Sequence, residues 1–355
     1  MIALRKHGYD ANMLSLDEIP VPKAGPGDVV IKVKAAGICG SDLPLRYGKV
    51  EGKTVDYPIV IGHEFAGEIA EVGEGVTRWK VGDRVVSDNS GYVCGTCHAC
   101  ASGQYLFCAN RKGMGNDMDG GFAEYVKIPA QVLQTFPNCL YRIPDGVPYD
   151  HAAILDPCCN AYKALVQEAK LLPGETVVIF GAGALGLFCV QIASIIGAGQ
   201  IIVVGLQEDV EARFPIAREL GATHTIASDS EDLQARIAEL VNKDDLAVVV
   251  DCAGAPEVFE NSIGLLRNGG KFVRIGYSKR PMGFSLDTMG LKGIVAIGHM
   301  GYDSTSWRNS INLLKNGRVA MDKIISHRMP LKDWDEGFEL VRSKKATKVI
   351  LIPEE

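Results

Sequence analysis

The chain has 355 residues, 47% of them hydrophobic and 23% charged, with a formal net charge of −6. This length predicts two domains rather than one core. Lys, Arg, Asp and Glu are mixed along the chain, so nothing indicates nucleic-acid or membrane-surface binding. No signal peptide is recognisable at the start, and the apolar runs have strand length only. We therefore expect a cytoplasmic protein, in which clustered cysteines bind metal rather than form disulfides.

The first 150 residues read as β-rich. Residues 28–35 end in partial apolar/polar alternation, and recurring glycines separate short β segments at 68–72 and 84–86. We predict a twisted, barrel-type domain with long loops. Residues 91–119 are rich in Cys, Gly and Asn and show neither helical nor strand periodicity, which predicts a lobe held together by something other than a hydrophobic core.

This lobe contains the pattern C-x2-C-x2-C-x7-C, formed by Cys94, Cys97, Cys100 and Cys108. Four thiolates at such spacings can close a tetrahedron around Zn²⁺ and leave no position open, as in a structural site. Such a site contributes on the order of 10 kcal/mol to folding. Disulfides and an iron–sulfur cluster are the alternatives, but no proline follows the last cysteine as in the ferredoxin pattern. His98 is interpreted as a bystander.

From about residue 150 the pattern changes to alternating helices and strands. A helix is predicted over 149–169, followed by the apolar strand 176–180. Such alternation is typical of a parallel, doubly wound sheet. The chain is then expected to return to the first domain after about residue 298 and to end in a strand over 347–352. The further elements that we predict are helices at 185–197, 210–220, 230–241 and 256–266, and strands at 200–204, 225–226, 247–251 and 271–275.

Between the first of these strands and its helix lies a G-x-G-x-x-G loop, Gly181-Ala182-Gly183-Ala184-Leu185-Gly186. In this context the loop predicts dinucleotide binding. Gly181 permits the turn, Gly183 lets the pyrophosphate approach the backbone, and Gly186 lets the helix pack on the strand, with Ala184 and Leu185 at the helix start. The alternative is a tight turn in a sheet that binds nothing.

The end of the second strand should distinguish NAD from NADP, because an acidic residue there binds the ribose 2′-hydroxyl of NAD. That position is Gly205, so the usual determinant is missing. No Arg or Lys stands at 205–210, and Glu208 and Asp209 would repel a 2′-phosphate; Arg213 is the nearest cation in sequence. We expect NAD, with Glu208 or Asp209 in the ribose role, while NADP is not excluded.

Two further segments place possible metal ligands among glycines, Gly-Ile-Cys39-Gly-Ser41-Asp and Gly-His63-Glu64-Phe-Ala-Gly. Together with the cysteine lobe and the glycine loop, they resemble the zinc-dependent medium-chain alcohol dehydrogenase family over essentially the whole chain. The resemblance implies an α/β chain with a GroES-like catalytic domain, 1–155 completed by 299–355, and a Rossmann nicotinamide-binding domain, 156–298. It also implies two zinc ions per chain and an active site in the cleft between the domains.

The resemblance assigns Cys39 and His63 as catalytic-zinc ligands, Glu64 as the acid that enters and leaves the zinc shell, and Ser41 as the acceptor of the substrate's hydroxyl proton. For the third ligand, Asp156-Pro157 with Asn160-Ala161 looks most like threonine dehydrogenases, and we favour Asp156. Cys158 and Cys159 lie close by and are the alternative ligands.

One departure affects the substrate, because Pro44 stands where polyol and threonine members carry a relay histidine. We expect oxidation of a secondary alcohol of a polyol or sugar to the ketone, with a threonine-like amino alcohol as the second possibility. His299 and Tyr302 are possible substrate contacts or ordinary loop residues. A non-catalytic nicotinamide-binding protein is the alternative of another class. The family also suggests a homo-oligomer, dimer or tetramer.

Overall fold

In the computed structural model, residues 1–50, 55–242, 244–278 and 280–354 are described. The chain divides into two units. The first comprises Met1–Asp156, Asp303–Gly317 and Met321–Glu355, and the second comprises Pro157–Tyr302 and Arg318–Ala320. No helix among the described residues is both long enough and apolar enough to cross a membrane.

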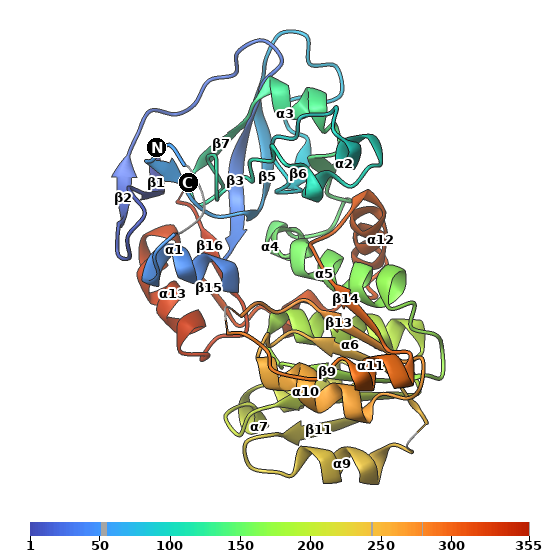
Figure 1. The fold of residues 1–355 in the computed structure, drawn as a ribbon. Coiled ribbons are helices and arrows are strands. Elements are labelled where there is room, and N and C mark those ends of the chain that lie inside the picture. Colours follow the sequence, from blue (N-terminus) through green and yellow to red (C-terminus); the bar gives the residue numbers. More distant parts are fainter. Residues whose placement is uncertain (51–54, 243, 279, 355) are drawn as a thin grey trace. The chain divides into compact units, whose positions relative to one another are not determined.

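The first unit is built mainly on antiparallel strands, with β15 and β16 paired in parallel (Figure 1). The larger of its two sheets has the order β15-β16-β3-β5-β6-β8, and β7 also pairs with β3. These strands are β15 (His327–Pro330), β16 (Val349–Ile352), β3 (Val29–Gly37), β5 (Glu64–Val72), β6 (Arg84–Ser87), β8 (Leu140–Arg142) and β7 (Tyr125–Ile128). The smaller sheet has the order β2-β1-β4, with β2 (Leu14–Glu18), β1 (Ile2–Lys6) and β4 (Ile59–Val60).

Two late segments complete the first unit. Strand β16 pairs antiparallel with the end of β3, with Ile350 opposite Gly37. Helix α12 (Ser304–Lys315) buries Trp307, which stacks on Tyr141 of β8 with ring centroids 5.2 Å apart. The other helices of this unit are α1 (Leu43–Tyr47), α2 (His98–Ala101), α3 (Ala130–Thr135), α4 (Tyr149–Ala153) and α13 (Trp334–Arg342).

The second unit is a six-stranded parallel sheet in the order β11-β10-β9-β12-β13-β14. This order reverses direction beside β9, which is the arrangement of a doubly wound dinucleotide-binding fold. Its strands are β9 (Thr176–Phe180), β10 (Gln200–Gly205), β11 (His224–Ala227), β12 (Leu246–Asp251), β13 (Lys271–Arg274) and β14 (Val295–Gly298). Its helices include α6 (Ala184–Ile196), α9 (Leu233–Leu240), α10 (Pro256–Leu265) and α11 (Asp287–Lys292).

Two predicted helices are interrupted in the structure, each next to a proline. The helix expected over 149–169 divides into α4, α5 (Leu155–Tyr162) and a π-helical segment, Lys163–Glu168. The helix expected over 210–220 divides into α7 (Asp209–Ala212) and α8 (Phe214–Glu219). Pro157 and Pro215 carry no N–H, and their rings crowd the backbone of the preceding turn. For this reason α4 ends before Pro157 and α7 ends before Pro215. The second break leaves Arg213 between α7 and α8.

Candidate metal and cofactor sites

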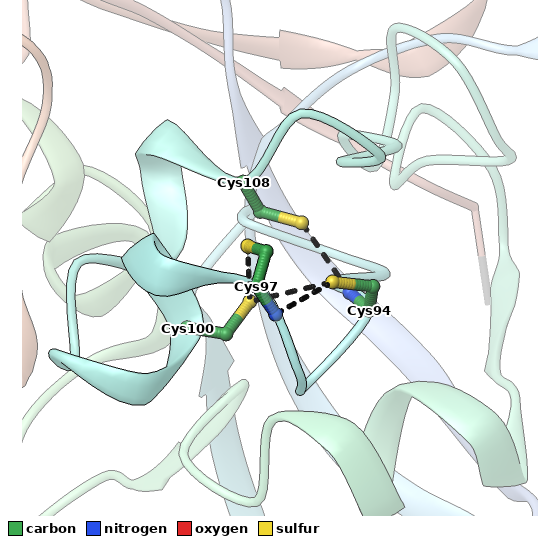
Figure 2. Close-up of side chains that lie close together, drawn as sticks. All are labelled: Cys94, Cys97, Cys100 and Cys108. Atoms are coloured by element: carbon green, nitrogen blue, oxygen red, sulfur yellow. Dashed lines mark hydrogen bonds between the residues drawn. The ribbon is translucent and has the colours of Figure 1, made fainter.

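The four cysteines of the lobe converge on one point. Figure 2 shows their side chains pointing towards one another. All four sulfurs lie within 4.8 Å of one another, with 3.6 Å between Cys97 and Cys100 and 4.0 Å between Cys94 and Cys100. Thiolates bound about 2.3 Å from one zinc ion are about 3.8 Å apart, so the spacing fits tetrahedral zinc. His98 is exposed and lies outside the group.

The backbone of the lobe prepares these sulfurs for a metal. Hydrogen bonds from the backbone N–H groups of Thr96 and Cys97 lower the pKa of Cys94 to about 5. The backbone N–H of Cys94 in turn donates to the Cys108 sulfur at 3.3 Å. Burial raises the pKa of the Cys100 thiol to about 12, so this sulfur gains most from a metal that replaces its proton. The arrangement is a closed, four-sulfur site for a structural ion.

A second cluster in the same unit joins Cys39, His63 and Glu64, whose ligand atoms lie within 4.8 Å of one another. Cys39 follows β3, and Glu64 begins β5, so the antiparallel pairing of these strands brings the two loops together. His63 and Glu64 are buried and Cys39 is half-buried. A soft thiolate, an imidazole and a carboxylate in one cluster suit a catalytic zinc, which keeps a position open for substrate.

Asp42 fixes the orientation of the His63 ring. Its Oδ1 lies 3.0 Å from His63 Nδ1, and its Oδ2 accepts the Cys39 backbone N–H at 2.9 Å. Because Nδ1 is engaged by the carboxylate, Nε2 presents its lone pair to a metal. Burial opposes the charged ring, but Asp42 and Cys39 raise the pKa of His63 well above its usual value. Ser41 is exposed, and its Oγ lies 3.4 Å from Nε2.

Lys348, which immediately precedes β16, neutralises Glu64. Its ammonium lies 2.6 and 2.8 Å from the two carboxylate oxygens and donates to the Ile38 carbonyl at 3.1 Å, and both side chains are buried. Burial lowers the pKa of this lysine, yet Glu64 and Cys39 together raise it above the usual value. The sequence analysis missed both Lys348 and Asp42. Asp42 could have been noticed as a carboxylate beside Ser41, whereas Lys348 directly precedes an apolar strand and belongs to no motif.

Asp156 lies outside the group of three ligands. Its carboxylate is buried and accepts a hydrogen bond from the Asn89 side chain at 2.9 Å, and its charge contributes to the raised pKa of Lys348. Cys158 and Cys159 are fully buried on α5. Pro44 is exposed at the start of α1, so no relay side chain stands there. The structure thus gathers three of the four predicted catalytic-zinc residues and leaves Asp156 beside them.

In the second unit the glycine loop connects β9 to α6, which begins at Ala184. A Cβ atom on Gly186 would meet the Gly181 carbonyl oxygen, so only glycine allows the helix to pack this close. A Cβ atom on Gly183 would meet nothing within 4 Å. The backbone therefore has an open approach at the start of a 13-residue helix, as a pyrophosphate requires.

The remaining predicted contacts in this unit have different environments. Glu208 is exposed, whereas Asp209 is buried against the end of β10. His299 is buried, and its ring nitrogens lie 2.7 Å from Glu168 and 3.0 Å from Asn160. Tyr302 is buried. Both ring nitrogens of His299 are thus engaged by neighbouring side chains, which favours a role in packing over a direct substrate contact.

Comparisons with known proteins agree with these metal and dinucleotide sites. Residues 25–138 match the model described as alcohol dehydrogenase GroES-like domain, and residues 184–316 match the model described as zinc-binding dehydrogenase. The chain is 47% identical to the uncharacterized zinc-type alcohol dehydrogenase-like protein YdjL of Escherichia coli K12, over 99% of this chain and 98% of that protein. It is 34% identical to a sorbitol dehydrogenase of Halalkalibacterium halodurans, over 99% of each chain.

Among solved structures, the 2R,3R-butanediol dehydrogenase of Bacillus subtilis superposes with a TM-score of 0.88 at 30% identity over 99% of each chain. The chain belongs to the zinc-type, medium-chain alcohol dehydrogenase family. It is an oxidoreductase that transfers hydride between an alcohol and a nicotinamide cofactor, and it uses zinc.

Proposed function

We propose that this dehydrogenase oxidises a secondary alcohol of a polyol or sugar to the ketone. The observation that carries the proposal is the clustering of Cys39, His63 and Glu64, with the buried carboxylate of Asp156 near enough to act on Lys348. The relatives named for sorbitol and for butanediol support it, because both compounds carry secondary hydroxyls with a hydroxyl on the next carbon. We assign catalysis to residues 1–155 with 299–355, and dinucleotide binding to 156–298.

Cys39, His63 and Glu64 would hold the catalytic ion, with Asp156 as our preferred further ligand. When bound, zinc polarises the alcohol oxygen and lowers the pKa of its hydroxyl. Asp42 keeps the His63 ring in place, and Lys348 holds Glu64 ready beside the cluster without leaving a buried charge unpaired. The Ser41 hydroxyl, exposed and 3.4 Å from His63 Nε2, receives the proton of the alcohol and passes it towards solvent.

We further propose two zinc ions per chain, the second held by Cys94, Cys97, Cys100 and Cys108. For the dinucleotide we propose NAD, bound at Gly181, Gly183, Ala184, Leu185 and Gly186. Support comes from the charge of the loop after β10, where Glu208 and Asp209 disfavour a 2′-phosphate. A reducing cytoplasm is the compartment that suits a chain whose ten cysteines are all free thiols, four of them gathered for metal.

We also propose a homo-oligomer that uses the β14 side of the second unit. β14 is the outer strand of the parallel sheet, and Val295 on it is 48% exposed, with Leu291 of α11 87% exposed. An uncovered strand edge with apolar neighbours favours pairing with a second copy. Val295→Lys is expected to shift the molecular mass measured by light scattering towards the monomer; an unchanged mass would place the interface elsewhere.

The test of function is a screen of NAD and NADP reduction with polyols, sugars, threonine and simple alcohols, run on the wild-type protein and on Cys39→Ala. We expect turnover of secondary polyol hydroxyls by the wild type and loss of both turnover and one zinc equivalent in the variant. Full oxidation by a variant that has lost one zinc would overturn the assignment of the catalytic site. Bound cofactor and zinc without turnover of any compound would favour the non-catalytic alternative.

A further inference from the structure

The carboxylate of Asp209 occupies the space of the side chain that Gly205 lacks. Gly205 is the last residue of β10, the position from which an acidic side chain reads the ribose in this fold. A Cβ atom built on Gly205 would lie only 2.6 Å from Asp209 Oδ2. The acid is therefore not missing from this edge of the sheet. It arrives from α7, four residues later in the sequence.

Two hydrogen bonds hold the carboxylate in this position. Oδ2 accepts the backbone N–H of Leu206 at 2.9 Å, and Oδ1 accepts from the Arg213 guanidinium, also at 2.9 Å. Asp209 is 5% exposed and Arg213 is 8% exposed, so the pair is shielded from solvent. The break between α7 and α8, which precedes Pro215, leaves Arg213 one turn after Asp209, where its side chain folds back onto the acid.

Arg213 is also the residue that could otherwise serve NADP, because a guanidinium at this edge binds a 2′-phosphate. Here its guanidinium forms an ion pair with Asp209. The surrounding loop adds further negative charge: Glu208 is exposed, and Asp229 accepts the backbone N–H of Gln207 at 2.7 Å. A phosphate would meet three carboxylates and a cation that is already paired.

We propose that the Asp209–Arg213 pair is the specificity determinant for the nicotinamide cofactor. Asp209 accepts the 2′-hydroxyl of the adenosine ribose of NAD, and by engaging Arg213 it withholds the guanidinium from the 2′-phosphate of NADP. The inference rests on the proposed NAD preference and assigns it to one ion pair rather than to Glu208.

The experiment measures dissociation constants for NADH and NADPH by isothermal titration calorimetry on the zinc-loaded protein, without substrate. Asp209→Asn keeps an acceptor for the Leu206 N–H but removes the charge. The affinity for NADH should fall about ten-fold or more, because hydrogen bonds to charged groups are the strong ones. The affinity for NADPH should rise about ten-fold, because Arg213 is then available to the 2′-phosphate. In Asp209→Asn/Arg213→Gln the NADPH gain should disappear while the NADH loss remains. Asp245→Asn, which removes an exposed carboxylate that the argument does not place near the ribose, is the matched control and should leave the ratio of the two affinities unchanged.

An unchanged ratio of NADH affinity to NADPH affinity in folded Asp209→Asn overturns the inference, as does an equal shift of this ratio in Asp245→Asn. If Asp209→Asn does not fold, the same measurement is made on Arg213→Lys. A ratio of NADH affinity to NADPH affinity several-fold below that of the wild type supports the inference, and an unchanged ratio overturns it. Equal wild-type affinities for the two dinucleotides would overturn the NAD preference together with the inference. A wild type that binds neither would overturn the proposed function itself.

Discussion

Gly37 and Glu64 face each other across β3 and β5, and the carboxylate of Glu64 occupies the space where Gly37 would carry a side chain. The glycine thus makes room for a buried acid beside Cys39 and His63. Since Lys348, just before β16, contacts the same carboxylate, the acid is confined from two sides.

Gly37→Ala should therefore displace Glu64 from the cluster. We expect a fall in activity of at least ten-fold and weaker retention of the catalytic zinc, because metal sites lose about 10- to 100-fold when supporting groups are disturbed. Alcohol oxidation and zinc content per chain measure the two effects. Gly40→Ala is the control, since a Cβ atom there meets nothing within 4 Å. Equal losses in both variants would contradict the role given to Gly37.

Lys348→Met should destabilise the protein by about 3–5 kcal/mol, the usual cost of leaving one member of a buried ion pair without its partner. Urea denaturation of the zinc-loaded protein measures this free energy of unfolding. Lys348→Met/Glu64→Gln should recover much of the loss, because no unpaired charge then remains. A single variant as stable as the wild type would show that the pair contributes nothing to stability.

Cys100→Ser should remove one zinc equivalent and loosen residues 91–119 while leaving the catalytic zinc in place. The reason is that the four sulfurs hold this lobe together. Its large apolar side chain Phe107 is exposed and so adds little to a hydrophobic core. Zinc analysis and limited proteolysis within the lobe measure the outcome. Cys139→Ala, which alters a buried cysteine outside the four-sulfur site, is the comparison and should keep both zinc ions. Two zinc ions in Cys100→Ser would disprove the site.

Stability should carry a pH dependence from Asp88. Burial raises the pKa of this acid to about 7, far above its ordinary value of about 4. The folded chain then holds a proton that the unfolded chain releases, so this group's contribution to stability is present below about pH 4 and is lost as the pH rises towards 7. Asp88→Asn, which retains an acceptor for Ser90, should gain up to about 4 kcal/mol over the wild type above pH 7 and little near pH 4. Urea midpoints at both pH values measure the difference, and a gain that does not change with pH would refute it.

Much of this architecture is predictable because its signals are local. The spacing of Cys94 to Cys108 and the glycines after β9 each lie within one short segment, so their geometry follows from the neighbouring backbone. The prediction of two continuous helices, over 149–169 and 210–220, was wrong because periodicity alone does not take Pro157 and Pro215 into account. The partners Lys348 and Asn89 could not be predicted, because they reach Glu64 and Asp156 only through the register of the sheets and the packing of the loops. Asp209 was named as a possible ribose residue, but its ion pair with Arg213 could not be predicted, because it depends on where α7 begins and ends.

The Glu64–Lys348 pair joins residues that are 284 positions apart in the chain. A ribosome releases Glu64 long before Lys348 exists, and the whole six-stranded sheet is synthesised in between. Throughout that interval the nascent first unit carries an acid without its counterion, and the end of β3 at Ala36 and Gly37 lacks its neighbour β16. Lys348, which will balance the charge of Glu64, is therefore synthesised late. Until then, burial of Glu64 would leave an unpaired charge and is unfavourable.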